Sequence, residues 1–221
     1  MKFVQFATVA TLIAAAVMFS GVFSSAAANG PYGNIDKVMG SAVVGSGEHY
    51  GNVSLVNGSV QMASNSSAKV VSLVNGSIDI RDDVSLDSAE TVNGAIEAGR
   101  NLTVNDSLST VNGEISLGDN AVVSGDVSTV NGDITLNNAQ LAQDITTVNG
   151  DIQLAGNTVV KGDVIFKKPG KKKSFFGWSN NDKPSLHIAA DAVVEGRIIL
   201  EQPVELDFAN PDMQAKVVER F

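Results

Sequence analysis

The stretch Thr129-Val130-Asn131-Gly132-Asp133-Ile134 contains the tripeptide that decides the fold, because Val-Asn-Gly occurs six times in the chain. The tripeptides begin at Val56, Val74, Val92, Val111, Val130 and Val148. Their spacings are 18, 18, 19, 19 and 18 residues. A degenerate copy, residues 33–40, precedes them and matches residues 51–58 at an offset of 18. A fixed period of this kind is typical of a solenoid, in which each repeat buries its apolar face against its neighbours.

Apolar positions within each repeat predict short strands. Every Val-Asn-Gly tripeptide is followed, after one residue, by an apolar-polar-apolar triplet, as in Ile134-Thr135-Leu136, and a period of two is typical of a strand with one buried face. Two further apolar columns lie before the tripeptide. The repeat therefore predicts an all-β, single-stranded β-solenoid with three sides and about nine coils of 18–19 residues. Left-handed coils of three hexapeptides tolerate single insertions poorly, so the two spacings of 19 favour a right-handed winding.

The repeated asparagines predict a ladder along the solenoid axis. Glycine adopts positive φ without steric cost and asparagine tolerates it, which makes Asn-Gly suited to a turn in every coil. Stacked coils would place the asparagines about 4.8 Å apart, so that their amides could hydrogen-bond to one another. The predicted structural ladder comprises Asn57, Asn75, Asn93, Asn112, Asn131 and Asn149. Ligand binding by this row is the functional alternative, and a hairpin at each Asn-Gly is the structural one.

The two ends of the chain do not follow the repeat. Residues 1–28 combine Lys2, an apolar run and Ala26-Ala27-Ala28, which predicts a cleaved signal peptide and a periplasmic or secreted protein. A retained membrane anchor is the alternative. Near the C-terminus, Asn210-Pro211 is typical of a helix start, and Met213, Val217 and Phe221 share one helical face. We therefore expect the β-solenoid over 29–209 and a short capping helix over 210–221.

Composition restricts the classes of function. The chain has 221 residues, no cysteine and a formal net charge of −9. Residues 29–160 contain 15 acidic and four basic residues, whereas residues 161–173 contain six lysines and one aspartate. An acidic body argues against nucleic-acid binding, which requires a broad basic face.

No catalytic constellation is recognisable. The two histidines, His49 and His187, are far apart and have no neighbours at metal-ligand spacing. We expect no cofactor, no small-molecule substrate and no enzymatic activity. A polysaccharide-active enzyme that uses Arg100 and the Asp126–Asp144 column is the less favoured alternative. The acidic column Glu114, Asp133 and Asp151 is a weak calcium candidate, because calcium binds carboxylate and carbonyl oxygens.

One insertion interrupts the repeat over residues 167–184. It brings lysines and aromatic residues together, a combination that suits an anionic membrane surface. The candidate contact residues are Lys167, Lys168, Lys171, Lys172, Lys173, Phe175, Phe176 and Trp178. An envelope protein or a second copy of the chain is an alternative partner. A solvated loop whose aromatics fold back on the solenoid is the non-functional interpretation.

Two families resemble parts of the repeat. The lines of the form (Ser/Thr)-Val-Asn-Gly-(Asp/Ser)-Ile resemble the adhesin-like β-strand-repeat families of bacteria. The Val-Val-x-Gly-x-(Val/Ile) lines near residues 160 and 194 are similar to those of the bactofilins, which are polymer-forming right-handed β-helix proteins. The resemblance covers residues 33–203 and implies a structural or envelope-associated role without catalytic residues. A signal peptide departs from typical cytosolic bactofilins, so self-assembly into a polymer is the second expectation and not the first.

Overall fold

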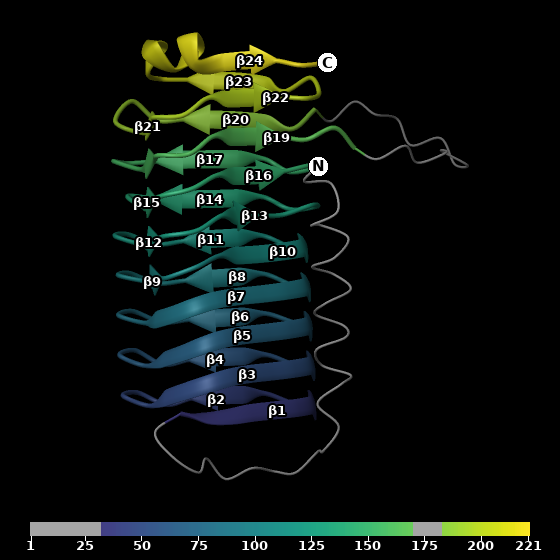
Figure 1. The fold of residues 1–221 in the computed structure, drawn as a ribbon, viewed down its shortest axis with the longest axis vertical. Helices are drawn as coiled ribbons and strands as arrows, with labels where there is room; N and C mark the ends of the chain where they lie inside the picture. The colour runs from purple at the N-terminus through teal and green to yellow at the C-terminus, as the bar shows by residue number, and fades with distance from the viewer. Residues whose placement is uncertain (1–31, 170–182) are drawn as a thin grey trace, which may run out of the picture.

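The computed structural model describes residues 32–169 and 183–221, and the expected signal peptide lies outside these residues. They form a β-solenoid of parallel, in-register strands, with nine turns and the beginning of a tenth (Figure 1). The predicted fold class is confirmed. The first four turns pair one long strand with one short strand: β1 (Gly33–Met39) with β2 (Ala42–Val44), β3 (His49–Asn57) with β4 (Val60–Met62), β5 (Ser67–Asn75) with β6 (Ile78–Ile80), and β7 (Ser85–Asn93) with β8 (Ile96–Ala98).

The later turns contain three short strands each. These are β9 (Thr103–Val104), β10 (Leu108–Asn112), β11 (Ile115–Leu117), β12 (Val122–Val123), β13 (Val127–Ser128), β14 (Ile134–Asn137), β15 (Gln140–Leu141), β16 (Ile145–Thr147), β17 (Ile152–Ala155), β18 (Val159–Val160), β19 (Val164–Phe166), β20 (Ser185–Ile188), β21 (Val193–Val194), β22 (Ile198–Leu200) and β23 (Glu205–Phe208). The 3₁₀ helix η1 (Pro211–Lys216) and strand β24 (Val217–Glu219) close the chain.

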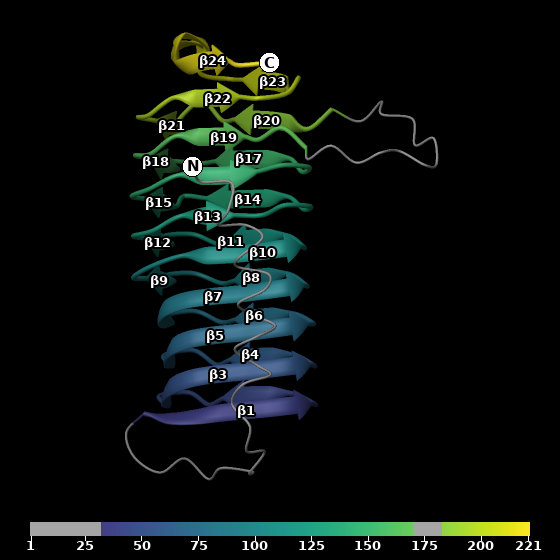
Figure 2. The ribbon, with the colours of Figure 1, turned by 45° about the vertical axis from the view of Figure 1, so that its right-hand side comes forward.

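The coils wind in the right-handed sense that the 19-residue spacings favour. In Figure 1 the long strands β3, β5 and β7 run to the right on the nearer side, the short strands β4, β6 and β8 return on the farther side, and the chain climbs from β1 to β24. The turned view in Figure 2 separates the two sides and shows the same direction.

A single extra residue divides the long strand at the fifth turn. Leu86 and Ala89 are three positions apart in β7, but their register partners Val104 and Leu108 are four positions apart. The extra residue bends the chain and divides the long strand into β9 and β10. From the fifth turn onward each coil therefore has three separate strands, where each lower coil has one long and one short strand.

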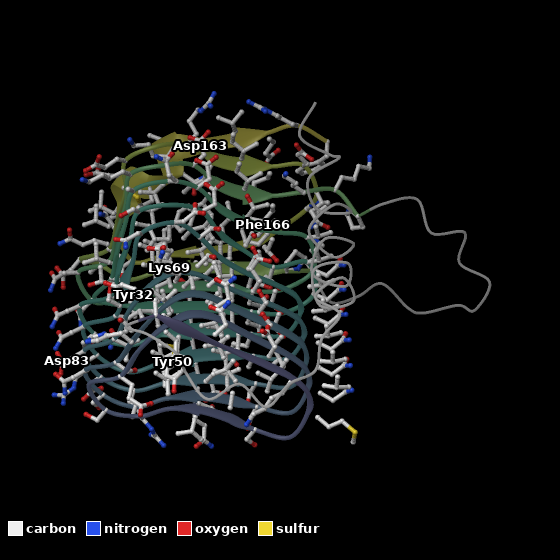
Figure 3. All side chains as sticks on the ribbon, turned by 60° about the horizontal axis from the view of Figure 1, so that its bottom comes forward. Tyr32, Tyr50, Lys69, Asp83, Asp163 and Phe166 are labelled. Carbon is white, nitrogen blue, oxygen red and sulfur yellow. The ribbon has the colours of Figure 1, made fainter. Side chains whose placement is uncertain are left out.

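The core consists of apolar columns that run the length of the stack. Alternate residues of most strands point inward, and the inward residues of most coils are fully buried, among them Val53, Leu73, Ile115 and Phe166. Phe166 is labelled in Figure 3. One inward column changes from leucine to threonine at Thr91 and Thr110 and returns to Phe166. Fully burying a side chain such as leucine contributes about 1.5–3 kcal/mol, so this repeated burial is the main source of stability.

The glycine of each tripeptide is required by the contact between coils. A Cβ atom added to Gly113 would lie 1.9 Å from the carbonyl oxygen of Gly94 in the coil below, and the corresponding distance at Gly76 is 1.6 Å. Only glycine allows the backbones to approach this closely, whatever the value of φ. Positive φ adds a second reason at some turns, such as 133° at Gly76.

The six tripeptide asparagines form a continuous ladder on the surface. In the five asparagines above Asn57, the side-chain Nδ2 donates to the Oδ1 of the asparagine one coil below, at 2.7–2.9 Å. The lowest rung, Asn57, stands above Met39 of the degenerate first coil. All six side chains are exposed, so the ladder is part of the outer wall.

The predicted capping helix over residues 210–221 is not what forms. Asn210 is the N-cap, and its side chain accepts a hydrogen bond from the backbone of Asp212, but the 3₁₀ helix ends at Lys216. The chain then becomes β24, in which Val217 pairs with Ile198. Strand β22 offers unpaired backbone groups that a continued helix would leave exposed, and pairing with them determines the structure after Lys216.

We predict that Gly113→Ala lowers the free energy of unfolding by about 3 kcal/mol or more, because the new methyl group overlaps a backbone carbonyl. Gly40→Ala is the matched control. Gly40 begins the same column with φ of +99°, and a Cβ atom there would have no neighbour within 4 Å, so its loss should be about 1 kcal/mol. Urea titration followed by circular dichroism measures both. Equal losses would contradict the stacking explanation.

Candidate functional site on the flank that carries the insertion

The insertion replaces one Asn-Gly turn without disturbing the stack. Thr147 pairs with Phe166, and Ile152 pairs with Leu186, so both flanking strands keep their register. The chain spans five positions from Thr147 to Ile152 but 20 positions from Phe166 to Leu186. The asparagine ladder ends here, because the eighth turn has no tripeptide. The root of the insertion is therefore held on a rigid frame.

Side chains of the ninth turn replace the backbone donors that the missing turn would supply. In the turns below, the backbone N–H of Asn149 donates to the carbonyl of Val130. At the insertion, the Gln202 side-chain amide donates instead to the carbonyls of Val148 and, at 3.0 Å, Lys167. The Lys168 backbone N–H donates to the Glu201 carboxylate at 3.3 Å.

Only part of the predicted contact surface belongs to the described residues. Lys167 is half-buried at the root, and Lys168 is exposed. Lys171, Lys172, Lys173, Phe175, Phe176 and Trp178 lie outside the described residues. On the other side of the insertion, the Ser185 backbone N–H donates to the Asp151 carboxylate at 2.7 Å, which fixes the chain where β20 begins.

The predicted acidic columns are organised by backbone hydrogen bonds. Asp126 accepts from the N–H of Asp144, and Asp144 accepts from the N–H of Asp163. The column ends at Arg197, whose backbone N–H and guanidinium both bind the Asp163 carboxylate at 2.8 Å. Burial acts to raise the pKa of Asp163, but the side-chain and backbone hydrogen bonds from Arg197 lower it on balance. Like charges at this spacing are tolerated because each carboxylate binds the next coil.

The calcium candidates follow the same pattern. The N–H of Asp151 donates to the Asp133 carboxylate at 2.8 Å, and Glu114 occupies the same position one coil below Asp133. In the described ranges 32–169 and 183–221, no group of three or more His, Cys, Asp or Glu residues is placed to hold a metal ion.

No family model, curated protein or solved structure matches the chain. In the part of the chain that the structure describes, no helix is long and apolar enough to span a membrane.

The residues considered for catalysis do not converge. His49 Nδ1 lies 2.6 Å from Ser67 Oγ in the lower turns, whereas His187 Nδ1 lies 2.7 Å from Asp207 Oδ2 near the upper end. The Arg100 guanidinium is paired with Asp82 at 2.7 Å. This hydrogen bond lowers the pKa of Asp82 and raises the pKa of Arg100.

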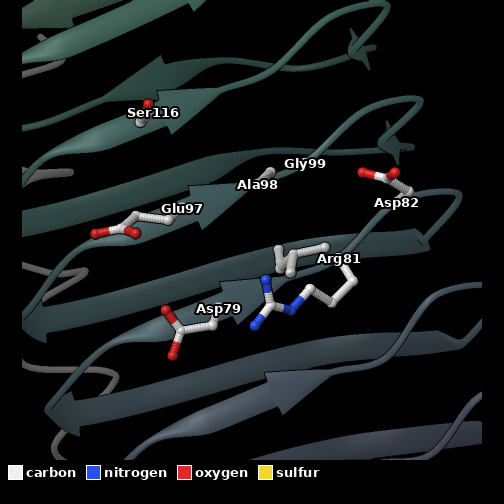
Figure 4. A pocket seen from close by; sticks show the side chains of 8 residues that line it. Asp79, Arg81, Asp82, Glu97, Ala98, Gly99 and Ser116 are labelled. Atoms are coloured by element: carbon white, nitrogen blue, oxygen red, sulfur yellow. The ribbon is translucent and has the colours of Figure 1, made fainter.

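A shallow hollow of about 400 Å³ lies on the outer face of β6 and β8. Figure 4 shows Asp79 and Glu97 one above the other on these strands, with Arg81 beside them. The hollow adjoins Ala98, which occupies a column position held by Ile80 and Leu117 in the adjacent coils. Its surface is a mixed-charge patch, and among its lining residues no nucleophile lies next to a base.

Glu90 is a carboxyl group that the sequence did not single out. It lies half-buried on β7, the last of the long strands. Burial raises its pKa, and the nearby Asp106 carboxylate raises it further. Its place in a column otherwise occupied by Ser72 and Ser109 could have indicated an unusual environment.

We predict that Gln202→Ala destabilises the root of the insertion by about 1–3 kcal/mol, because two carbonyls lose their donor. Limited proteolysis within residues 167–184 should become faster, with no change in the circular dichroism spectrum. Gln153→Ala, at an exposed position of β17, is the control and should leave the cleavage rate unchanged. Cleavage at the wild-type rate in Gln202→Ala would contradict this role.

We predict that Glu90→Gln stabilises the protein at pH 7 by up to about 1 kcal/mol. The pKa of Glu90 is higher in the folded state than in the unfolded state, so ionised Glu90 destabilises the folded protein at pH 7. Below the pKa of the unfolded state the carboxyl is protonated in both states, and this loss of stability disappears. Thermal unfolding should show a higher midpoint for the variant at pH 7 and no difference near pH 4. A constant difference at both pH values would indicate a packing effect instead.

Proposed function

We propose that the protein is a non-enzymatic scaffold or adhesin-like binding module of the bacterial cell envelope. Under this proposal the chain is exported through residues 1–28 and presents the segment 167–178 to a membrane surface or an envelope partner. The observation that supports it most is the preserved register on both sides of the insertion, from Ile152 with Leu186 to Phe166 with Leu200. A regular stack that tolerates one non-repetitive segment is suited to carrying that segment.

The chemistry of the segment suggests the partner. The segment 167–178 contains five lysines, in contrast to the 15 acidic residues of 29–160. Each lysine near an anionic lipid surface contributes about 1 kcal/mol, and tryptophan and phenylalanine favour the interface. The acidic body would be repelled by the same surface. This distribution favours a contact in which the segment faces the lipid and the acidic coils face away.

We predict that the protein co-sediments with vesicles containing anionic lipid and that replacing Lys171, Lys172, Lys173, Phe175, Phe176 and Trp178 by serine abolishes this binding. A charge-matched control replaces Lys69, Arg81 and Lys161, which lie on the coils, by serine. This control should still bind the vesicles. If neither the wild type nor the control sediments, the membrane contact is excluded and an envelope protein becomes the partner to seek. Filaments in electron micrographs of the purified protein would instead favour a bactofilin-like polymer.

A further inference from the structure

The first coil ends the solenoid with a lysine in place of a core residue. Strand β1 pairs with β3 in register, so that Ile35 lies below Val53 and Lys37 lies below Leu55. The Leu55 column is the inward column that continues through Leu73. Lys37 therefore occupies a core position of the outermost coil, and its side chain is exposed at the end of the tube.

The Lys37 ammonium takes the place of the backbone donor that a further coil below would supply, and the described residues contain no such coil. In the turns above, the carbonyl before each short strand accepts an N–H from the coil below: Ser59 accepts from Ala42, and Ser77 accepts from Val60. Ser41 is the equivalent residue of the first coil. Its carbonyl accepts the Lys37 Nζ at 2.6 Å. The acceptor that an added coil would need is thus already occupied.

The other end is closed in a comparable way. The Val194 N–H points away from the coil below and contacts the sulfur of Met213 at 3.4 Å, and the Lys216 Nζ donates to the Glu195 carbonyl at 2.7 Å. Helix η1 therefore covers this corner, with Met213 buried. Beside it, the last strand β24 has only three residues, and its Glu219 is the register partner of core residue Leu200.

Both terminal strands thus have a charged residue in the same inward column. Lys37 lies below Leu55, and Glu219 lies above Leu200. An unpaired strand edge is a template for association, and inward-pointing charges and short edge strands are ways to prevent it. An added coil would bury these charges in a column that is apolar or threonine elsewhere, and unpaired burial of a charge is costly.

We propose that these end residues block coil-on-coil association, so that the protein acts as a single capped rod and not as a filament subunit. Lys37 is the principal block at the N-terminal end, because β1 and β2 have no pairing partner on their outer edges among the described residues. Four exposed apolar side chains, Tyr32, Val38, Met39 and Val43, lie on this coil and would favour association if the charge were absent. Figure 3 views the molecule toward this end.

The test is the oligomeric state of Lys37→Leu, measured by sedimentation velocity over a wide range of protein concentrations. We expect the wild type to remain monomeric. The variant should dimerise through its first coil and no further, with an association constant at least about tenfold above that of the wild type. Lys37→Arg retains the charge and the donor and should remain monomeric. Lys161→Leu makes the same change on the exposed flank and should also remain monomeric.

Two outcomes would overturn the proposal: a wild type that dimerises or forms filaments, or a Lys37→Leu variant as monomeric as the wild type. Circular dichroism and thermal unfolding establish that each variant is folded. If Lys37→Leu does not fold, Lys37→Met, which keeps a long unbranched side chain, is judged by the same criteria. This test does not involve the inserted segment, so its result is independent of vesicle binding.

Discussion

The close stacking of the Asn-Gly turns is the constraint on which the rest of the structure depends. At Gly76 and Gly113 the backbone of one coil touches the carbonyl of the coil below at a distance that excludes any side chain. This contact fixes the register of each coil that carries the tripeptide relative to the previous one. A slip by one residue would move a side chain onto the glycine column and turn the apolar residues outward. The tripeptide is therefore nearly invariant within the chain, whereas the other columns vary in residue type.

Strict register places residues of the same type above one another in successive coils. This stacking stabilises some columns and destabilises others. Apolar columns gain continuous burial, and asparagines gain partners, because an amide is both donor and acceptor. Stacked carboxylates repel one another. Asp144 and Asp163 offset this repulsion by accepting hydrogen bonds from backbone N–H groups of the next coil. A column of acids in such a solenoid is therefore weak evidence for a metal site. The buried threonine column is not fully hydrogen-bonded, since the hydroxyls of Thr91 and Thr147 have no partner in the described structure.

The period predicted the coils, the columns and the position of the ladder, because these follow from local turn chemistry and a two-residue alternation. The division of the long strand from the fifth turn onward was not predicted, since a spacing of 19 does not show that the extra residue lies between Val104 and Leu108. The capping helix was wrong because the tertiary pairing of Val217 with Ile198 overrode the local pattern. Lys37 could have been recognised from the sequence alone, because the offset of 18 already aligns it with Leu55.

Because every coil of a solenoid presents an unpaired strand edge and an apolar surface, further coils can always be added, and the terminal coils need a feature that prevents this. Each coil offers the next a complete set of acceptors and an apolar surface, so the last coil at each end remains a template unless its chemistry differs. In this chain the difference is provided by the residues that break the repeat, Lys37 in the first coil and the segment from Asn210 to Glu219 in the last. The insertion after Phe166 is a third departure, and Gln202 satisfies the carbonyls that it exposes. The repeated sequence forms the regular stack of coils. The positions that depart from the repeat close its two ends and accommodate the inserted segment.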